Sequence, residues 1–514
     1  MTRTQNIKKN LIFNLLKFVI QLVLQFVLRT ILIYYMGVEY LGINGLYTNI
    51  FAFLNLAELG IGSAIVFSMY QPIADGNIEK IKSLQNLYKK FYLYIFLIVL
   101  VVGGMITPFI KYFINGEVKL DINIYLLFVM YLVNTLVGYL SAHKRSLLFA
   151  FQRNDLENKV RTICIIGMTI LQSIVIILFK NYYLFFTINI ISTLVECVLI
   201  HFVANKYFPE INGKSVPIDS DTKKSITKNI AALSLHKIGG TIVFSTDNIL
   251  ISTFCSIAIL GAYSNYNLIV TSIFSIFCLF YNSLLGSVGN LINTSSLDYV
   301  YDRFNKIKFC FVYLCAFSTI CLIVLFQPFM LLWTKGGEFL LGNASVLLIS
   351  VNFYFQRMRD PINVFREAAG LFWYDRWRPI AEAIVNLVVS IVLAQFMGIN
   401  GIFIGTIVST LVAPFWVEPY VLYKHYFKRS VGDYFKRYIL DALIMIAGAV
   451  ICYFVCSFIP DGGIWWLILK FATCIILSNV ILIIAYMPTK EFKDLWQMGK
   501  NMLKTLFKRK KKKV

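Results

Sequence analysis

Residues 91–110 read FYLYIFLIVLVVGGMITPFI, twenty consecutive positions without a charged side chain. At 1.5 Å of rise per residue, such a helix is about 30 Å long, which matches the hydrocarbon core of a bilayer. Similar blocks recur along the whole chain of 514 residues, which is 58% hydrophobic and 14% charged. Soluble proteins carry about 25% charged residues, so the composition excludes an array of soluble domains. The blocks are continuous rather than alternating, and they predict membrane-spanning α-helices instead of barrel strands.

The sequence therefore predicts an all-α polytopic membrane protein with about fourteen transmembrane helices. Forty of the 48 Lys and Arg residues fall at the N-terminus, in loops after even-numbered spans or in the C-terminal tail, and four fall in the other loops. Because cytoplasmic loops collect Lys and Arg, this asymmetry places both termini in the cytoplasm. The expected spans are 11–35, 41–70, 91–114, 122–148, 160–180, 183–206, 228–255, 258–291, 306–333, 339–366, 378–397, 400–424, 437–459 and 464–487.

The chain also contains a weak internal repeat. An offset of 219 aligns the Leu-Gly pair at 41–42 with the pair at 260–261, and an offset of 217 aligns Arg161 with Arg378. Spans 1–6 then recur as spans 7–12 in the same orientation, which predicts two parallel six-helix repeats forming two lobes, a plan common in transporters. The expected domains are an N-lobe at 1–207, a cytoplasmic linker at 208–227, a C-lobe at 228–427, and spans 13 and 14 with a basic tail at 428–514.

Polar residues form a stripe along the first span. Lys17, Gln21, Gln25 and Arg29 recur every four residues, so they share one face of a helix. Lipid disfavours such a stripe, which predicts that it faces protein or a wet cavity. Alternatively, the glutamines bond to neighbouring helices, Lys17 extends to the inner surface, and Arg29 reaches the outer surface.

Several acidic and imidazole groups also fall inside apolar blocks. His236 and Asp247 lie on one face of the seventh span, where they could titrate or bind a cation. Glu196 lies within the sixth span and Glu382 near the start of the eleventh. Each acid is a candidate for binding a coupling ion, H+ or Na+. A buried ion pair or a helix cap is the alternative role for each of them.

A third cluster of charges surrounds the loop between spans 10 and 11. It combines five arginines with aromatic residues, and Arg357 and Arg366 lie deepest toward the membrane. Arginine binds phosphate with two parallel hydrogen bonds, and aromatic rings stack on sugar faces. These two arginines are therefore candidate ligands of a substrate. Ordinary positive charge on a cytoplasmic loop, with an aromatic belt, explains the other members.

Other functions leave no trace in the sequence. The net charge of +22 follows from the cytoplasmic loops, so we expect no nucleic-acid partner. The ten cysteines lack metal-ligand spacing and fall mostly in apolar blocks. Gly213-Lys214-Ser215 resembles the end of a phosphate-binding loop, but Phe208 stands where the first glycine belongs. With no nucleotide motif and no catalytic motif, we expect neither an ATP-driven pump nor an enzyme, and we expect no metal and no cofactor beyond a coupling ion.

Two regions of the chain resemble a known family. Residues 245–252 (STDNILIS) and 260–266 (LGAYSNY), then 359–363 (RDPIN), 366–372 (REAAGLF) and 398–401 (GING), are similar to stretches typical of capsule and O-antigen repeat-unit flippases. These proteins form the polysaccharide-transporter branch of the multidrug/oligosaccharidyl-lipid/polysaccharide exporter superfamily. The likeness covers the whole chain in span count and repeat plan, and Asp247 lies within the matching motif.

The resemblance implies a function and a place in the cell. It implies a flippase that moves undecaprenyl-diphosphate-linked oligosaccharide across a bacterial cytoplasmic (inner) membrane by alternating access, with a cationic cavity between two lobes. Its partners would be the lipid-linked oligosaccharide, membrane lipids and polysaccharide polymerase machinery. A cation-coupled multidrug exporter of the same superfamily is the first alternative. A membrane polysaccharide polymerase is the second, and the short outer loops argue against it.

Overall fold

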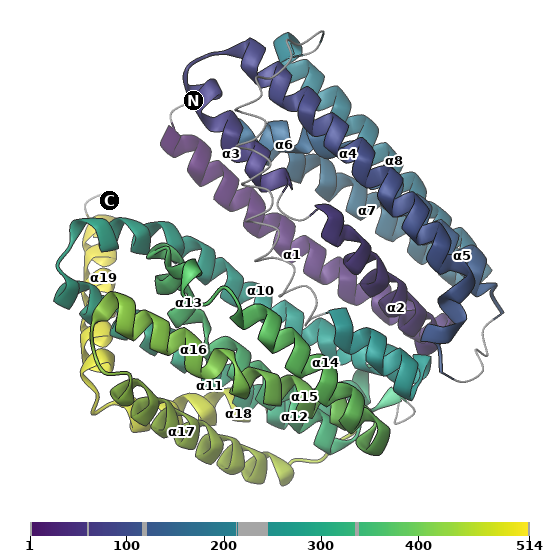
Figure 1. Cartoon of the computed structure of the whole chain (residues 1–514). Helices are drawn as coiled ribbons and strands as arrows, with labels where there is room; N and C mark the ends of the chain where they lie inside the picture. Colours follow the sequence, from purple (N-terminus) through teal and green to yellow (C-terminus); the bar gives the residue numbers. More distant parts are fainter. Residues whose placement is uncertain are drawn as a thin grey trace. The chain divides into compact units, whose positions relative to one another are not determined.

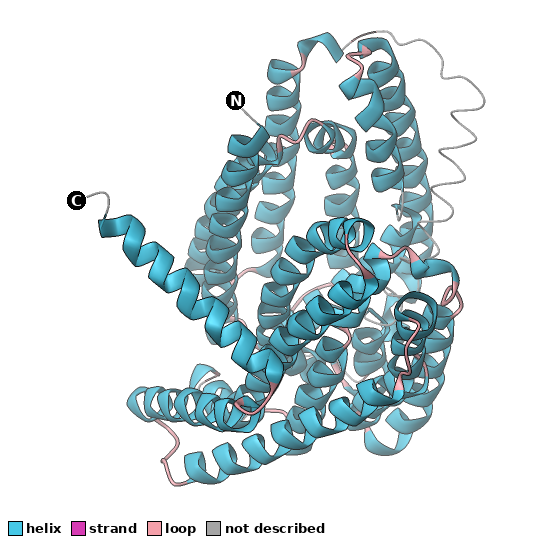
Figure 2. Ribbon diagram, turned by 90° about the vertical axis from the view of Figure 1, so that its left-hand side faces the viewer, coloured by secondary structure: helices cyan, strands magenta, loops and turns pink. Residues whose placement is uncertain are grey.

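The computed structural model describes residues 3–58, 61–115, 121–211, 213, 245–334 and 339–511. Within these ranges every regular element is a helix (Figure 2). This confirms the all-α, polytopic fold class. Contacts within the chain define two compact units, Met1–Ser264 and Asn265–Val514, which we call unit 1 and unit 2.

Unit 1 is built from long helices and short connecting turns. Its main packing pairs are α1 with α7, α7 with α8, α5 with α8 and α3 with α4 (Figure 1). Asparagine side chains at 77, 123 and 181 accept hydrogen bonds from the first backbone N–H groups of α4, α5 and α8, which fixes where these helices begin. The helices are α1 (Arg3–Tyr35), α2 (Val38–Leu54), η1 (Asn55–Glu58), α3 (Ile61–Ala74), α4 (Ile78–Ile106), η2 (Thr107–Phe113), α5 (Ile124–Tyr139), α6 (Ala142–Ala150), α7 (Asn154–Phe179), α8 (Tyr182–Tyr207), η3 (Pro209–Ile211) and η4 (Ile251–Cys255).

Unit 2 repeats the packing order of unit 1 and adds helices to it. The pairs α11 with α12, α12 with α15 and α14 with α15 correspond to α4 with α5, α5 with α8 and α7 with α8. Helices α17 and α18 pack against α11 and have no counterpart among the described helices of unit 1. The helices are α10 (Ile257–Thr294), which begins in unit 1, α11 (Leu297–Trp333), α12 (Asn343–Met358), α13 (Asp360–Ala368), η6 (Leu371–Trp373), α14 (Arg378–Met397), α15 (Ile399–Val412), α16 (Pro414–Val421), η7 (Leu422–Phe427), α17 (Gly432–Ser457), α18 (Ile464–Tyr486) and α19 (Lys490–Lys511).

Ten of the described helices are long and apolar enough to cross a membrane, and the α5–α6 pair, bent by 41°, makes an eleventh. The predicted second span is interrupted by η1, and the tenth divides into α12 and α13. The second division has a local cause, because Pro361 lacks the N–H that would continue α12. The predicted seventh span lies mostly outside the described residues, and the count of fourteen stays a prediction.

The predicted domain limits also stay a prediction. Most of the linker at 208–227 lies outside the described residues. Residues 245–264, which the repeat assigns to the second copy, belong to unit 1 by their contacts. Asn115 contributes to this packing, because its backbone N–H donates to the carbonyl of Ser252 at 3.0 Å and its side chain to that of Cys255 at 3.1 Å.

Two glycines allow α2 and the start of α10 to approach closely. A Cβ atom on Gly42 would overlap the backbone carbonyl of Ile257, and a Cβ atom on Gly261 would overlap that of Val38. The contact is reciprocal, since each glycine contacts the residue that lies four positions before the other glycine. Gly42 and Gly261 are also equivalent in the sequence repeat. Small residues allow such backbone approach between helices in membranes.

Candidate functional site

The polar stripe of α1 contacts protein at both ends. The ammonium of Lys17 donates a hydrogen bond of 2.6 Å to the amide oxygen of Asn158 on α7. Arg29 donates one to the hydroxyl of Ser264. Between them, Gln21 is half-buried and Gln25 is exposed. Asn158 and Ser264 are neutral groups of unit 1, and the cavity role of the stripe stays a prediction.

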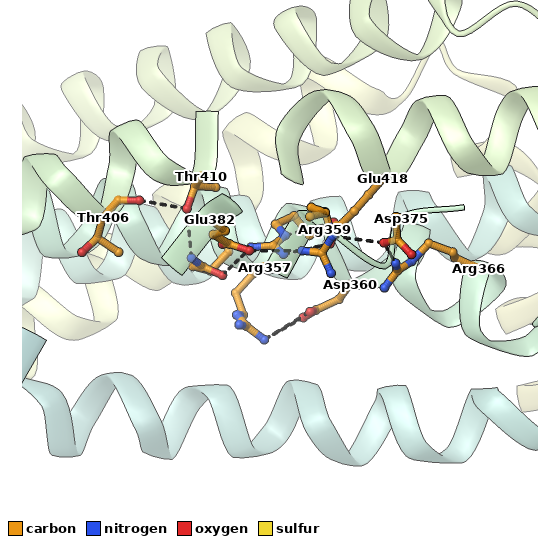
Figure 3. A network of polar contacts seen from close by, with 11 residues as sticks. Arg357, Arg359, Asp360, Arg366, Asp375, Glu382, Thr406, Thr410 and Glu418 are labelled. Atoms are coloured by element: carbon orange, nitrogen blue, oxygen red, sulfur yellow. Dashed lines mark hydrogen bonds and ion pairs between the residues drawn. The ribbon is translucent and has the colours of Figure 1, made fainter. Parts of the chain in front are cut away.

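A dense cluster of ion pairs occupies unit 2, on α14, α16 and the turn before α13 (Figure 3). Arg359 binds Glu418 with two parallel hydrogen bonds, of 2.8 and 3.0 Å. Its third nitrogen lies 3.1 Å from Glu382. Arg378 contacts the same two carboxylates, at 2.9 Å to Glu418 and 3.1 Å to Glu382. The two arginines and two glutamates therefore form a closed ring of charge-assisted bonds.

The cluster continues into the loop between α13 and α14. Asp375 accepts a hydrogen bond of 3.1 Å from Arg378 and forms an ion pair with Arg366 of α13 (Figure 3). We call the six residues Arg359, Arg366, Arg378, Asp375, Glu382 and Glu418 the buried ion cluster. It holds three cations and three carboxylates, so its formal charges cancel.

Burial makes this balance important for stability. Side-chain exposure ranges from 1% at Glu418 to 15% at Arg359. Removing one partner from a buried ion pair leaves an uncompensated charge, which typically costs about 3–5 kcal/mol. The cluster therefore fixes α13, α14 and α16 to one another at one end of unit 2.

The arginines proposed as substrate ligands have internal partners. Arg357 is 3.0 Å from Asp360, and its guanidinium lies over the ring of Phe274 at 4.0 Å from the centroid. Arg366 pairs with Asp375 inside the buried ion cluster. Each positive charge is therefore compensated within unit 2. Whether either arginine also binds substrate stays a prediction.

Sequence reasoning did not identify the partners of Glu418, which organises the cluster. An acid at the end of a span predicts a buried ion pair or a helix cap, and Glu418 anchors both Arg359 and Arg378. Glu418 lies 59 residues from Arg359 in the chain, so no local spacing reveals the pair. The available signal was the excess of arginine around one loop, which requires carboxylates if those side chains are buried.

The candidate ion-coupling residues have different surroundings. Glu196 forms an ion pair of 3.1 Å with Arg145, and Glu382 belongs to the buried ion cluster. Asp247 is 9% exposed and interacts electrostatically with Tyr263, also in unit 1. His236 lies outside the described residues. Across the described part of the chain, no three His, Cys, Asp or Glu side chains converge as a metal site would require.

Cations in unit 1 use fewer carboxylates. Lys144 is buried and donates a hydrogen bond of 2.8 Å to the amide oxygen of Asn205. Arg153 pairs with Asp155 at 3.0 Å in the turn before α7, with 30% of the arginine side chain exposed. Lys17 likewise donates to an amide, that of Asn158, so unit 1 combines amide and hydroxyl partners with single ion pairs, and the six-residue ion cluster lies in unit 2.

Comparison with known proteins gives a family and a fold. Residues 7–288 match the family described as "Polysaccharide biosynthesis protein". No curated protein matches the sequence. Among solved structures, "Lipid II flippase MurJ, inward closed conformation" is similar over 93% of this chain and 98% of its own, with a TM-score of 0.66 and 15% identity.

Multidrug transporters share the fold over less of the chain. An inward-facing multidrug resistance MATE family transporter of the MOP superfamily matches 79% of this chain and 94% of its own, with a TM-score of 0.57 and 13% identity. A mutant of the Vibrio cholerae MATE transporter VcmN matches 83% and 98%, with a TM-score of 0.56 and 15% identity. At these identities the likeness establishes the fold.

Proposed function

We propose, from the premise that this chain belongs to the polysaccharide biosynthesis protein family, that it is a flippase for a lipid-linked oligosaccharide. The cargo would be an undecaprenyl-diphosphate-linked repeat unit of a capsule, O-antigen or exopolysaccharide. Transport would cross a bacterial cytoplasmic membrane by alternating access, with both termini in the cytoplasm. The polymerase machinery that uses the repeat unit outside is the expected protein partner.

The structural similarity extends further along this chain for the flippase than for the drug exporters. The flippase structure is similar over 93% of this chain, whereas the two multidrug transporters cover 79% and 83%. A drug exporter of the same superfamily is the second candidate, because its fold is shared. Export of small cations favours acidic cavity residues, and the α1 stripe presents cations instead.

Arg29 and Lys17 are the proposed contacts of the diphosphate. The hydrogen-bond partners Ser264, for Arg29, and Asn158, for Lys17, are neutral. A phosphate oxygen could replace either partner, since serine and asparagine accept the same hydrogen bonds. Gln21, Gln25 and His236 would contact the glycan. Arg357 and Arg366 would take part if cargo displaced Asp360 or Asp375.

The coupling of transport to an ion gradient is proposed at an acidic side chain. No nucleotide motif is present in the sequence, so energy would come from H+, from Na+ or from removal of cargo outside. Asp247 is the first candidate because it is buried and lies in the motif shared with flippases. Glu196 and Glu382 are the others, although both already form ion pairs with arginine.

Replacement of Arg29 tests the flippase directly. Arg29→Ala should abolish transport in a strain that lacks the native gene, and lipid-linked intermediates should accumulate in the inner leaflet. Arg29→Lys should keep partial activity, because a point charge still binds phosphate without the two-pronged geometry. Arg376→Ala, which removes an exposed arginine, is the matched control and should transport normally.

Two outcomes would argue against the proposal, and a folding defect would leave Arg29 untested. Full transport by Arg29→Ala would show that Arg29 does not contact the cargo during transport. Loss of the protein from the membrane would make the defect one of folding, which immunoblotting of membranes detects. Drug resistance conferred by the parent chain, with no intermediate accumulating in the deletion strain, would select the multidrug exporter instead.

A further inference from the structure

Two cavities lie against the same face of two equivalent helices. A cavity of about 450 Å3 in unit 1 is lined from α4 by Asn86, Lys89, Lys90 and Leu93. A cavity of about 400 Å3 in unit 2 is lined from α11 by Asn305, Lys308, Phe309 and Val312. Each of these positions recurs 219 residues later, the offset that relates the two copies. The two cavities therefore share an asparagine, a lysine and an aliphatic side chain at matched positions of one helix.

The opposite walls of the two cavities carry different charges. In unit 2 the cavity is closed by α17 and α19, which supply Asp433, Asp441 and Glu491 beside the cations. In unit 1 the lining contains Lys89, Lys90 and His143, and no acidic residue. Within the described residues, no carboxylate lies at ion-pair distance from either lysine of this cavity. The cavity of unit 1 therefore has the charge of an anion-binding site.

An apolar stripe leads away from this cavity along α4. Leu93, Leu97 and Val101 follow Lys89 at intervals of four residues, so they lie on the same side of the helix. They are 58%, 47% and 52% exposed, respectively. A cationic recess at one end of an exposed apolar helix face is complementary to an anionic phospholipid. The headgroup would lie at the cations and the acyl chain along the stripe.

In unit 2, other helices of the protein cover the equivalent cavity and supply its carboxylates. There α17 packs against α11, and α17 and α19 line the cavity around Lys308, the counterpart of Lys89, with Asp441 and Glu491. Unit 1 has no described helix in the place of α17 or α19. Among the described residues, its lysines have no acidic neighbour at ion-pair distance, and its apolar helix face is exposed.

We propose that the cavity over Lys89 and Lys90 binds the phosphate headgroup of an anionic membrane phospholipid. The acyl chain lies along Leu93, Leu97 and Val101. The lipid takes the position on unit 1 that α17 and α19 take on unit 2. This site is separate from the α1 stripe and does not depend on the identity of the cargo.

Lipid binding to the purified full-length protein tests the proposal. Phosphatidylglycerol is titrated into the protein in detergent, and bound lipid is counted by native mass spectrometry. Lys89→Gln/Lys90→Gln should bind phosphatidylglycerol roughly tenfold more weakly than the parent, because two headgroup contacts are lost. Lys89→Arg/Lys90→Arg should bind it nearly as well as the parent.

The matched control removes two charges from the same helix outside the cavity. Lys80→Gln/Lys82→Gln should leave phosphatidylglycerol binding within about twofold of the parent, since neither residue lines the cavity. Equal weakening of both double variants would show diffuse attraction by the helix and would overturn the proposal. Unchanged binding by Lys89→Gln/Lys90→Gln would overturn it as well.

Two further measurements distinguish a bound lipid from a soluble anion and from a folding defect. Inorganic phosphate at millimolar concentration should fail to displace phosphatidylglycerol, because it cannot use the apolar stripe. Displacement would identify a site for soluble phosphate and would overturn the proposal. The melting temperature of the Gln variant without added lipid should equal that of the parent, because both lysines are exposed.

Discussion

The α6–α7 corner of unit 1 and the α13–α14 corner of unit 2 follow one plan, but they neutralise their charges differently. In unit 1, the pair of Arg145 with Glu196 links α6 to α8, and 25% of the arginine side chain is exposed. In unit 2, a link from Arg359 to Glu418 joins the start of α13 to α16, with the glutamate 1% exposed. One corner is an open ion pair and the other is a closed, charge-balanced cluster.

The difference indicates where to seek cations that bind ligands. An arginine held by two buried carboxylates must lose those partners before it can bind phosphate, at a cost of several kcal/mol. A cation that is hydrogen-bonded to an amide or a hydroxyl gives up that partner at a much smaller cost in free energy. Unit 2 therefore uses its arginines to fix helices in place, whereas Lys17 of unit 1 donates its hydrogen bond to a neutral amide.

Labelling of the two corners provides the sharpest test of their equivalence. If the repeat is parallel, both corners face the cytoplasm, and cysteines at Gln152 and Arg376 should both resist an impermeant thiol reagent in intact cells. A cysteine at Asp121, in the loop before α5, should react fully. All three positions are exposed, so accessibility alone does not separate them. Labelling of one corner but not the other in intact cells would show that the copies are antiparallel.

Stability should separate the two corners next. Glu418→Gln removes the carboxylate shared by two buried arginines and should destabilise the protein by about 3 kcal/mol. Glu196→Gln, the matched change in unit 1, should cost about 1 kcal/mol because water reaches its arginine. Thermal unfolding in detergent, with both variants in parallel, measures the difference. Equal losses would mean that the cluster in unit 2 is no more structural than the single pair in unit 1.

The smallest expected effect on stability concerns Asp247. It belongs to the second copy by sequence and to unit 1 by its contacts. Asp247→Asn keeps the shape of the side chain and should change stability by less than about 1 kcal/mol. If Asp247 binds the coupling cation, transport in reconstituted vesicles should no longer respond to an imposed H+ or Na+ gradient. A response equal to that of the parent would exclude Asp247 and direct attention to Glu196 and Glu382.

The sequence predicts the helices well because their causes are local. Continuous apolar blocks determine that the segments are helical, and Asn77 or Asn181 determines where a helix begins. The breaks are harder to predict, because hydropathy averaged over a block does not register where the backbone hydrogen bonding stops. Pro361 gave a local signal for the division of the tenth span, whereas the break at 55–58 in the second span had no comparable one.

The roles of charged residues depended on contacts between distant segments. The sequence singled out Arg357 and Arg366 by their expected depth in the membrane, and both side chains are buried within the protein. Their partners could not be inferred, because each arginine could face a carboxylate, a ligand or lipid. The cavity over Lys89 was equally hidden, since its lysines look like ordinary charges of a cytoplasmic loop until their lack of acidic neighbours is seen in three dimensions.

The reciprocal contact of Gly42 and Gly261 has a meaning for the history of the chain. Two equivalent residues that each meet the other's neighbourhood form an isologous contact, which is the geometry of a symmetric homodimer. If the two copies arose by duplication of a half-length ancestor, that ancestor would have paired through this glycine on each subunit. In the single chain a mutation at one glycine no longer occurs twice, so the two sides can diverge independently. Both positions require glycine because neither helix has room for a side chain there.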